Sequence, residues 1–262
     1  MITSPHNPRI KLVRELLQDR KHREQEGLFV IEGVRLVEEA MVKGLVPKFG
    51  FFSQDLSPRG QSSLSALLKE NADMEEIDSR LLNQLSPTET SQGILVVLPL
   101  PDLAIKKDCD LILALDNLRD PGNLGTIMRT AAAFGVGALF LSPGTVDAFS
   151  PKVVRSSMGA HFKLPIAYKN AEEIQSFCKG RTGQKMAILG TDGQLGCPCW
   201  EMNLAQPVCL VIGSEAEGMS IAFRQIADGF LCIPMILGNE SLNAAMAAGI
   251  LCYEAHRQRQ IK

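Results

Sequence analysis

Three short polar segments in the second half of the chain contain the residue types that could do chemistry. They are LDNLRDPGNLGTIMRTAAAFG at 115–135, LVIGSEAEG at 210–218 and IPMILGNESLNAAMAAG at 233–249. Each begins at the end of an apolar run of strand length and breaks at a turn rich in Gly, Asn, Ser or Pro. Several strand ends that deliver polar loops are typical of a ligand site in an α/β sheet. The layout therefore favours an enzyme over a bare scaffold.

The charged side chain that stands out in the first segment is Arg129. It lies in an otherwise small and apolar helical stretch, where a lone guanidinium must reach solvent, a carboxylate or a substrate oxygen anion. Asn123, in the turn before it, is predicted to be the N-cap of that helix. Without Arg129 the turn would be an ordinary connection between a strand and a helix.

The second and third segments add polar positions at predicted strand ends. Gly213 would let a ligand approach the backbone closely. Glu215 stands where parallel sheets form their sites, although a solvated loop acid is an equal alternative. In the third segment Ser241 is a competent N-cap for a last helix over 242–258. That helix is rich in Ala and Gly, which suits close packing against a helix of the same chain or of another subunit. Its predicted apolar face consists of Leu242, Ala245, Met246, Gly249, Ile250 and Tyr253.

Several familiar site motifs are absent from the sequence. No GxGxxG follows a strand and no GxxxxGK[ST] occurs, which argues against a dinucleotide-binding dehydrogenase and a P-loop nucleotide hydrolase. The HExxH zinc motif and the GxSxG nucleophile elbow are also absent. Among the seven cysteines, Cys197-Pro198-Cys199 stands alone, without the paired spacing of a metal site. Buried thiols in a reducing cytoplasm are therefore predicted.

The elements around the three segments divide into two α/β units. In residues 1–98 the pattern predicts helices from Asn7-Pro8, at 34–42 and around 64–68, and strands at 28–31, 49–52 and 94–98. A connector punctuated by proline follows at 99–108. From 109 to 262 helices alternate with predicted strands at 111–115, 138–141, 162–166, 186–189, 208–212 and 230–233. This alternation predicts a mostly parallel sheet that is covered on both faces.

Bulk composition limits the possible partners. The chain has 262 residues, of which 45% are hydrophobic, so it can supply proper cores. A net charge of −2 gives no global basic signal, so any nucleic-acid surface must be local. No apolar run approaches the roughly 18 residues that span a bilayer, and the polar N-terminus lacks a signal-peptide core. No membrane partner and a cytoplasmic location are expected. A local basic face is predicted on Arg9, Lys11, Arg14, Arg20, Lys21 and Arg23.

Together the three segments resemble motifs one, two and three of the SpoU/TrmH family of RNA ribose methyltransferases, in order, spacing and residues. The N-terminal NPRIKLVRELL and GLFVIEGVRLVEEA also resemble the ribosomal-protein-like substrate-binding domain of that family. The resemblance implies an RNA-binding α/β domain at 1–98, a linker at 99–108 and a methyltransferase domain at 109–262. It implies a SPOUT fold for the last of these, an α/β sheet whose C-terminal part threads a trefoil knot. It further implies S-adenosylmethionine as methyl donor, no metal, and a homodimer.

The resemblance also assigns roles to individual positions. The catalytic positions would be Asn123, Arg129, Glu215, Ser241 and Asn243. The donor-binding positions would be Leu189, Gly190, Ile212, Gly213, Ile233, Met235 and Leu242. The implied reaction moves a methyl group from a sulfonium to a ribose 2′-hydroxyl. Because guanidinium keeps its proton in proteins, we expect Arg129 to stabilise the developing alkoxide more than to act as a base. Ala216 departs from the usual Gly of the family, which would cost about 1 kcal/mol if that backbone needs a positive φ.

Alternatives to a ribosomal RNA methyltransferase stay open. The same scaffold could methylate transfer RNA, or it could serve as a non-catalytic RNA-binding or ribosome-assembly factor. A small-molecule methyltransferase is a third class, against which the basic N-terminal domain argues. The complete set of five catalytic positions favours an enzyme, and the ribosomal-type N-terminal domain favours large-subunit ribosomal RNA. Which nucleotide is methylated, and whether subunits share the site, is not encoded in any short motif.

Overall fold

The computed structural model describes residues 1–86, 91–180, 185–193, 195–214, 216–236 and 241–260. It divides into two compact units. The first comprises Met1–Pro101 and Asp147–Phe162, and the second comprises Asp102–Val146 and Lys163–Lys262. The chain therefore passes between the units three times. The stretch 147–162, which the sequence placed in the methyltransferase domain, groups with the first unit.

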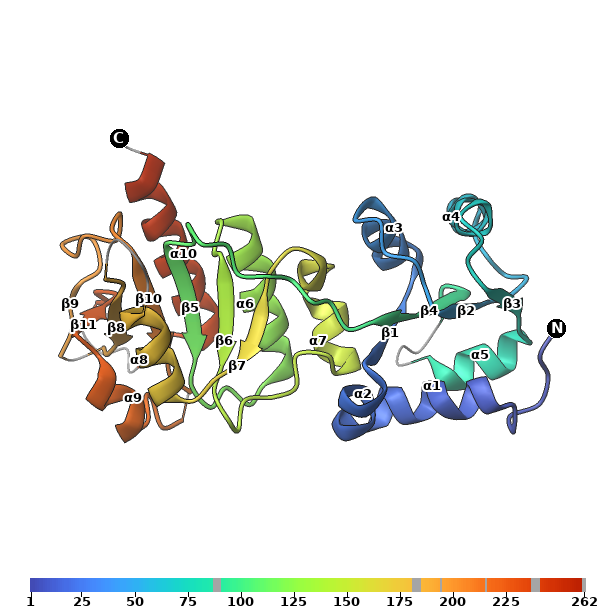
Figure 1. Cartoon of the computed structure of the whole chain (residues 1–262), viewed down its shortest axis with the longest axis horizontal. Coiled ribbons are helices and arrows are strands. Elements are labelled where there is room, and N and C mark those ends of the chain that lie inside the picture. Colours follow the sequence, from blue (N-terminus) through green and yellow to red (C-terminus); the bar gives the residue numbers. More distant parts are fainter. Residues whose placement is uncertain (87–90, 181–184, 194, 215, 237–240, 261–262) are drawn as a thin grey trace. The chain divides into compact units, whose positions relative to one another are not determined.

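The first unit is built on a mixed four-stranded sheet in the order β1 (Leu28–Glu32), β4 (Ile94–Pro99), β2 (Phe49–Phe52) and β3 (Met74–Glu76). Strand β4 is antiparallel to β1 and β2, whereas β2 and β3 are parallel. Figure 1 shows α1 (Pro8–Gln18) and α5 (Ser79–Leu85) on one side of this sheet and α3 (Val34–Val42) and α4 (Pro58–Lys69) on the other. The unit also contains α2 (Arg20–Glu26) and α7 (Pro151–Ser156). Each face of the sheet therefore has its own apolar core.

Helix α1 shows how local sequence sets these elements. Asn7 caps it by accepting a hydrogen bond from the backbone N–H of Arg9, and a proline occupies its first turn. Ile10, Val13 and Leu16, at helical spacing, are buried against the sheet. The helix predicted from Asn7-Pro8 is therefore confirmed.

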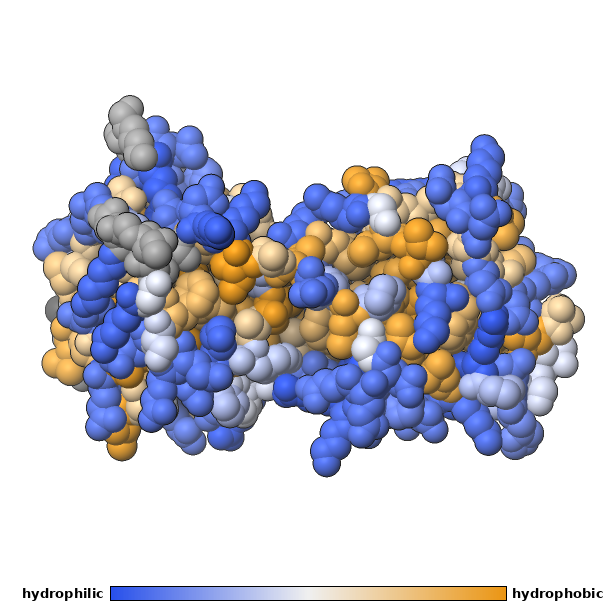
Figure 2. Space-filling view, viewed as in Figure 1, coloured by the Kyte–Doolittle hydropathy of each residue, from blue (hydrophilic) through white to orange (hydrophobic). Residues whose placement is uncertain are grey.

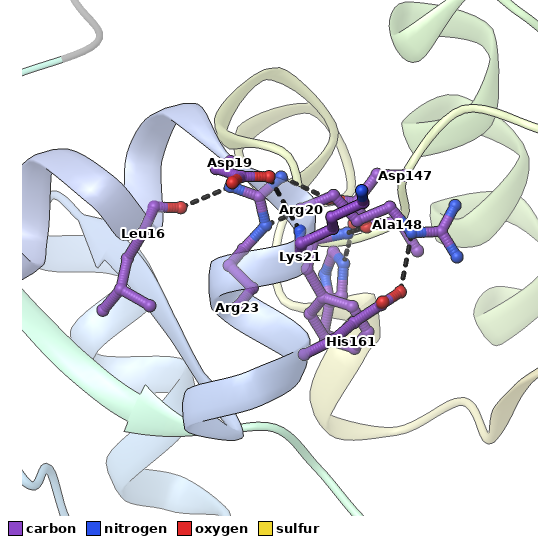
Figure 3. A network of polar contacts seen from close by, with 10 residues as sticks. Leu16, Asp19, Arg20, Lys21, Arg23, Asp147, Ala148 and His161 are labelled. Carbon is purple, nitrogen blue, oxygen red and sulfur yellow. Dashed lines mark hydrogen bonds and ion pairs between the residues drawn. The ribbon is translucent and has the colours of Figure 1, made fainter.

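Residues 147–162 are attached to the first unit by a buried ion pair (Figure 3). The Arg23 side chain, 5% exposed, places Nη2 at 2.5 Å from Oδ2 of Asp147. Its Nη1 donates to the backbone oxygen of Leu16, at the end of the preceding helix. A buried guanidinium needs such partners, because an unpaired buried charge is strongly unfavourable. Arg23, which the sequence placed on the basic RNA-binding face, therefore serves the core of its own unit.

A buried histidine completes this attachment. His161 has Nε2 at 2.6 Å from the carbonyl oxygen of Ala148 and Nδ1 at 2.9 Å from the hydroxyl of Ser157. Because a carbonyl oxygen only accepts, Nε2 must hold a proton. The ring also lies among aromatic side chains, with centroids 5.0 Å from Phe149 and 6.1 Å from Phe29. Desolvation lowers the pKa of the buried ring to about 4, so His161 is a neutral structural side chain.

The second unit contains a seven-stranded sheet whose paired strands are all parallel, as the alternation of elements predicts. Its order is β7 (Ile166–Tyr168), β6 (Ala138–Leu141), β5 (Leu111–Leu115), β10 (Val208–Ile212), β8 (Ala187–Thr191), β11 (Gly229–Cys232) and β9 (Cys197–Pro198). Helices α6 (Pro121–Ala133) and α10 (Ala244–Gln260) cover one face, and α8 (Ala171–Lys179) and α9 (Ile221–Ile226) cover the other (Figure 1). The strands β5, β10 and β8 in the centre are buried on both faces, which explains their nearly continuous apolar sequences.

Some predicted elements were wrong. A strand was expected at 162–166, but the structure has a 3₁₀ turn at Ala160–Phe162 and the strand β7 only from Ile166. Phe162 is apolar because it packs in the core of the first unit, so its hydrophobicity did not indicate a strand of the second. Strands β3 and β9 were missed, because they are short and lack an apolar run.

No helix among the described residues is long and apolar enough to cross a lipid bilayer.

Candidate active site

A cavity of about 210 Å³ opens at the carboxyl ends of β8, β10 and β11 in the second unit. Its walls come from residues 191–193, from 212–214 with Gly218, from 231–235 and from 241–251 around the start of α10. Most of the lining side chains are apolar or absent. Asp192 is the only charged side chain among the described residues that line it. A slot of this composition suits a ligand with a flat apolar ring and a few polar groups.

Five of the seven predicted donor-binding residues line this cavity, namely Ile212, Gly213, Ile233, Met235 and Leu242. Leu189 and Gly190 do not line it, and the next residues of the same strand end, Thr191, Asp192 and Gly193, do so instead. For Gly190 the reason is packing, because a Cβ at this position would lie 2.8 Å from Sδ of Met219.

Gly213 is confined by its own loop. A Cβ at this position would lie 2.2 Å from the carbonyl carbon of Gly218. The loop closes on itself through two backbone hydrogen bonds between Ser214 and Gly218, of 3.0 and 2.9 Å. Glycine at 213 is therefore required first by the loop that shapes the cavity wall. Glu215, the predicted catalytic acid of this loop, lies outside the described residues.

The first and third polar segments meet through two asparagines. Asn243 donates from Nδ2 to Oδ1 of Asn123 at 3.0 Å. Its own Oδ1 accepts from the backbone N–H groups of Ala245 and Met246, at 2.9 and 3.3 Å, and so caps α10. These two backbone donors fix the orientation of the amide, which leaves the NH₂ group to face Asn123. The structure thus joins two predicted catalytic residues that are far apart in the chain.

The predicted helix caps were wrong at both of these turns. Asp120 caps α6, since its Oδ1 accepts from the backbone N–H of Asn123 at 2.7 Å. Asn243 takes the capping position at α10 that Ser241 was expected to fill. The Asn123 side chain accepts from Asn243 instead, and Ser241 lines the cavity.

Arg129 lies exposed on α6. No hydrogen bond or ion pair links its guanidinium to another described residue. An exposed guanidinium without a partner among the described residues can bind an anionic group of a substrate. The structure does not bring Arg129 into contact with Asn123, Ser241 or Asn243.

Sequence reasoning missed a buried carboxylate that supports this site. Asp116, at the end of β5, accepts from the backbone N–H of Ser220 at 2.7 Å and from the Ser142 hydroxyl at 3.2 Å. It thereby ties the strand end before Asn123 to the loop that follows β10. The signal in the sequence was a polar residue directly after an apolar strand, but only the tertiary structure shows what it binds.

The predicted basic face of the first unit is partly neutralised. Arg9 pairs with Asp73 and Glu75 at 2.5 Å each, and Arg20 pairs with Glu24 at 2.7 Å. Arg23 is buried, as described above. The remaining predicted residues, Lys11, Arg14 and Lys21, form no ion pair with another described residue, and Arg14 donates to the backbone oxygen of Pro5.

Among the described residues no group of three or more His, Cys, Asp or Glu side chains is arranged to hold a metal ion. All seven cysteines are free thiols.

Comparison with known proteins agrees with this geometry. The profile of the SpoU rRNA Methylase family matches residues 110–253, and that of the MRM3-like substrate binding domain matches residues 7–96. The 23S rRNA (guanosine(2553)-2'-O)-methyltransferase RlmP of Bacillus subtilis is 32% identical over 254 residues, which cover 96% of this chain and 97% of RlmP. Mitochondrial rRNA methyltransferase 3 of Mus musculus is 31% identical over 313 residues, covering 98% of this chain and 74% of the mouse protein.

A solved structure is similar over the same extent. The SpoU methyltransferase AviRb from Streptomyces viridochromogenes, crystallised in complex with AdoMet, superposes with a TM-score of 0.86 at 30% identity. The match covers 98% of this chain and 100% of AviRb. The chain belongs to the SpoU rRNA methylase family.

Proposed function

We propose that this protein transfers a methyl group from S-adenosylmethionine to a ribose 2′-hydroxyl of large-subunit ribosomal RNA. The observation that carries the proposal is the cavity at the strand ends, beside which the bonded pair Asn123 and Asn243 joins two of the polar segments. The family of the chain and the name of RlmP support the reaction and the type of RNA. The trefoil knot that the resemblance implies is part of the same proposal.

The cavity residues fit the methyl donor. Ile212, Ile233 and Leu242 offer an apolar slot for the adenine ring, and the loop at Gly213 offers backbone groups for its ring nitrogens. A Cβ at Gly193 would meet no atom within 4 Å, so the wall there leaves room for a ligand. When bound, S-adenosylmethionine would supply a methyl group that its sulfonium already activates. The relative AviRb was crystallised with AdoMet, which supports this assignment.

The chain's own residues would act mainly by positioning and charge. Arg129, exposed and without a partner among the described residues, would stabilise the oxygen anion as the 2′-hydroxyl loses its proton. Asn123 and Asn243 would orient the ribose, and Ser241 would contact it from the cavity edge. We assign Glu215 to ordering the loop after β10. Holding the two reactants together would supply much of the remaining rate enhancement.

RNA binding is assigned to the first unit. Figure 2 shows hydrophilic side chains over α1 and α2, where Lys11, Arg14 and Lys21 keep positive charge that no described carboxylate neutralises. Lysine and arginine on such a face bind phosphates without reading sequence. The match to a substrate-binding domain over 7–96 supports this division of roles.

We assign the interface of a homodimer to the exposed face of α10. Four large apolar side chains are exposed in or next to this helix, Leu242, Met246, Ile250 and Tyr253. They lie at a spacing that forms one stripe, and an exposed apolar stripe on a helix is typical of a protein interface. A two-fold axis would pair the stripe with its copy. We also assign the protein to the cytoplasm, in keeping with seven free thiols and a ribosomal substrate.

The test is methylation in vitro and in cells. Binding of S-adenosylmethionine is measured by calorimetry, and tritium transfer is measured to purified large-subunit RNA and to transfer RNA. Ribose methylation of ribosomal RNA is then mapped in cells with and without the protein. Loss of one ribosomal 2′-O-methyl group together with transfer in vitro supports the proposal. Methylation of transfer RNA but not of ribosomal RNA would identify transfer RNA as the substrate. RNA binding without donor binding would identify a non-catalytic assembly factor.

A further inference from the structure

Arg224, on α9, contacts three segments that are distant in the chain. Its Nη2 donates to Oδ2 of Asp192 at 2.8 Å, and its Nε donates to the backbone oxygen of Met219 at 3.3 Å. Its Cζ also lies 5.6 Å from the centroid of the Phe230 ring. One guanidinium thus bridges the loop after β8, the loop after β10 and the strand β11.

Each of these three segments supplies a wall of the donor cavity. Asp192 lines the cavity itself, Gly218 before Met219 lines it, and Leu231 after Phe230 lines it. Arg224 is not among the lining residues. It therefore contacts the segments that form the cavity walls without lining the cavity itself, and it can set the spacing of these segments.

Asp192 is the point at which this arrangement reaches the cavity. Its Oδ1 accepts from the backbone N–H of Leu195 at 3.1 Å, and its own N–H donates to the backbone oxygen of Leu231 at 3.0 Å. The Asp192 side chain is 11% exposed, and Arg224 forms an ion pair of 2.8 Å with it. Loss of that ion pair would leave a nearly buried carboxylate with less compensation for its charge, which favours a rearrangement of the loop.

Only arginine supplies all three contacts at once. The planar guanidinium donates along two directions while its face stacks on an aromatic ring, whereas an ammonium is a point charge without a stacking face.

We propose that Arg224 is a positioning residue that holds the donor cavity in its binding shape, acting through Asp192, Met219 and Phe230. This rests on the proposed function, because it takes the cavity to be the site of S-adenosylmethionine. The role is distinct from those of the three polar segments, since Arg224 does not line the cavity itself.

The primary measurement is the Kd for S-adenosylmethionine by calorimetry in the full-length protein. Arg224→Gln should raise this Kd by about tenfold or more, and Arg224→Lys, which keeps the charge but loses the planar fork, should raise it by a few-fold. In steady-state assays the KM for the donor should rise while the KM for RNA stays unchanged. A purely structural role would lower the amount of active protein without separating the two KM values.

The matched control is Lys185→Gln. Lys185 forms an exposed ion pair of 2.8 Å with Asp228 in the same unit. Both residues precede their strands, β8 and β11, and so lie at the end of the sheet opposite the cavity. This variant should leave the donor Kd unchanged.

A double-mutant cycle tests whether Arg224 acts through Asp192. Asp192→Asn keeps an acceptor for Leu195 but removes the charge, so the double variant with Arg224→Gln should lose less affinity than the product of the two single losses. If the affinity loss of the double variant equals the product of the two single losses, Arg224 does not act through Asp192. A donor Kd within twofold of wild type in folded Arg224→Gln and Arg224→Lys would overturn the positioning role alone. Absence of donor binding in the wild type would overturn the proposed function and this proposal together.

Discussion

Acidification below pH 6.5 should destabilise the first unit through a single side chain, His161. The ring is completely buried, and desolvation is the main reason why its pKa falls from 6.5 to about 4. The hydrogen bond to Ala148 and the negative charge of Asp147 oppose this shift but do not cancel it. The folded protein therefore keeps His161 neutral at a pH where the unfolded chain protonates it.

The sign and size of the effect follow from linkage. Between the two pKa values the unfolded state binds more protons, so the stabilisation is fully present above pH 6.5 and is lost as the pH falls toward 4. The difference between the two pKa values corresponds to about 3 kcal/mol in total, of which about 2 kcal/mol should be lost between pH 7 and pH 4.5.

Urea denaturation followed by circular dichroism measures this loss. Wild type is compared with His161→Gln, which cannot titrate but keeps an amide N–H for the Ala148 carbonyl. All other titrating groups are common to both proteins, so the wild type should lose about 2 kcal/mol more than the variant over this pH range. Equal losses in the two proteins, or an imidazole that titrates near pH 6.5 by NMR in the folded state, would refute the reasoning.

Three further variants test the site and the RNA-binding face. Arg129→Ala should keep the donor Kd and lower kcat by about 10²–10³, as expected for one preorganised charge that acts in the transition state; near-normal turnover would remove its catalytic role. Asn243→Asp should keep the cap of α10 but lose the donor to Asn123, so the melting temperature should change little while kcat falls; an unchanged kcat would separate the asparagine pair from catalysis. Replacing Lys11, Arg14 and Lys21 by Gln should weaken RNA binding and reduce its salt slope by about 2, for three lost phosphate contacts on single-stranded RNA; an unchanged slope would place the RNA elsewhere.

Much of the fold was predictable because its elements are set locally. Strands β2, β5, β6 and β10 and helix α3 have the bounds that their apolar runs predicted. Such runs are informative in a parallel sheet, where central strands are buried on both faces. Strand β3, by contrast, has the sequence MEE and forms through backbone pairing with β2, which no side-chain pattern reveals.

The unpredicted part depends on partners distant in sequence. Arg23 resembled a surface cation because it lies in a basic helical stretch, but its partner Asp147 is 124 positions away. In the same way, the cavity residues supplied by the second and third polar segments could be predicted, whereas Asp192 and Arg224 could not. Their importance comes from a contact between a loop and helix α9 that the chain brings together only when it is folded.

The return of residues 147–162 to the first unit has a consequence for synthesis on the ribosome. Val154 and Phe162 complete the core around Phe29, so the N-terminal unit cannot close when its first 101 residues have emerged. At about 5–20 residues per second it must wait roughly 3–12 s longer, while β5 and β6 of the other unit already emerge. Ribosome-bound chains that expose residues 1–101 should therefore be cleaved by protease, and chains that expose residues 1–162 should resist it. Protection of the shorter chains would show that the N-terminal segment closes on its own.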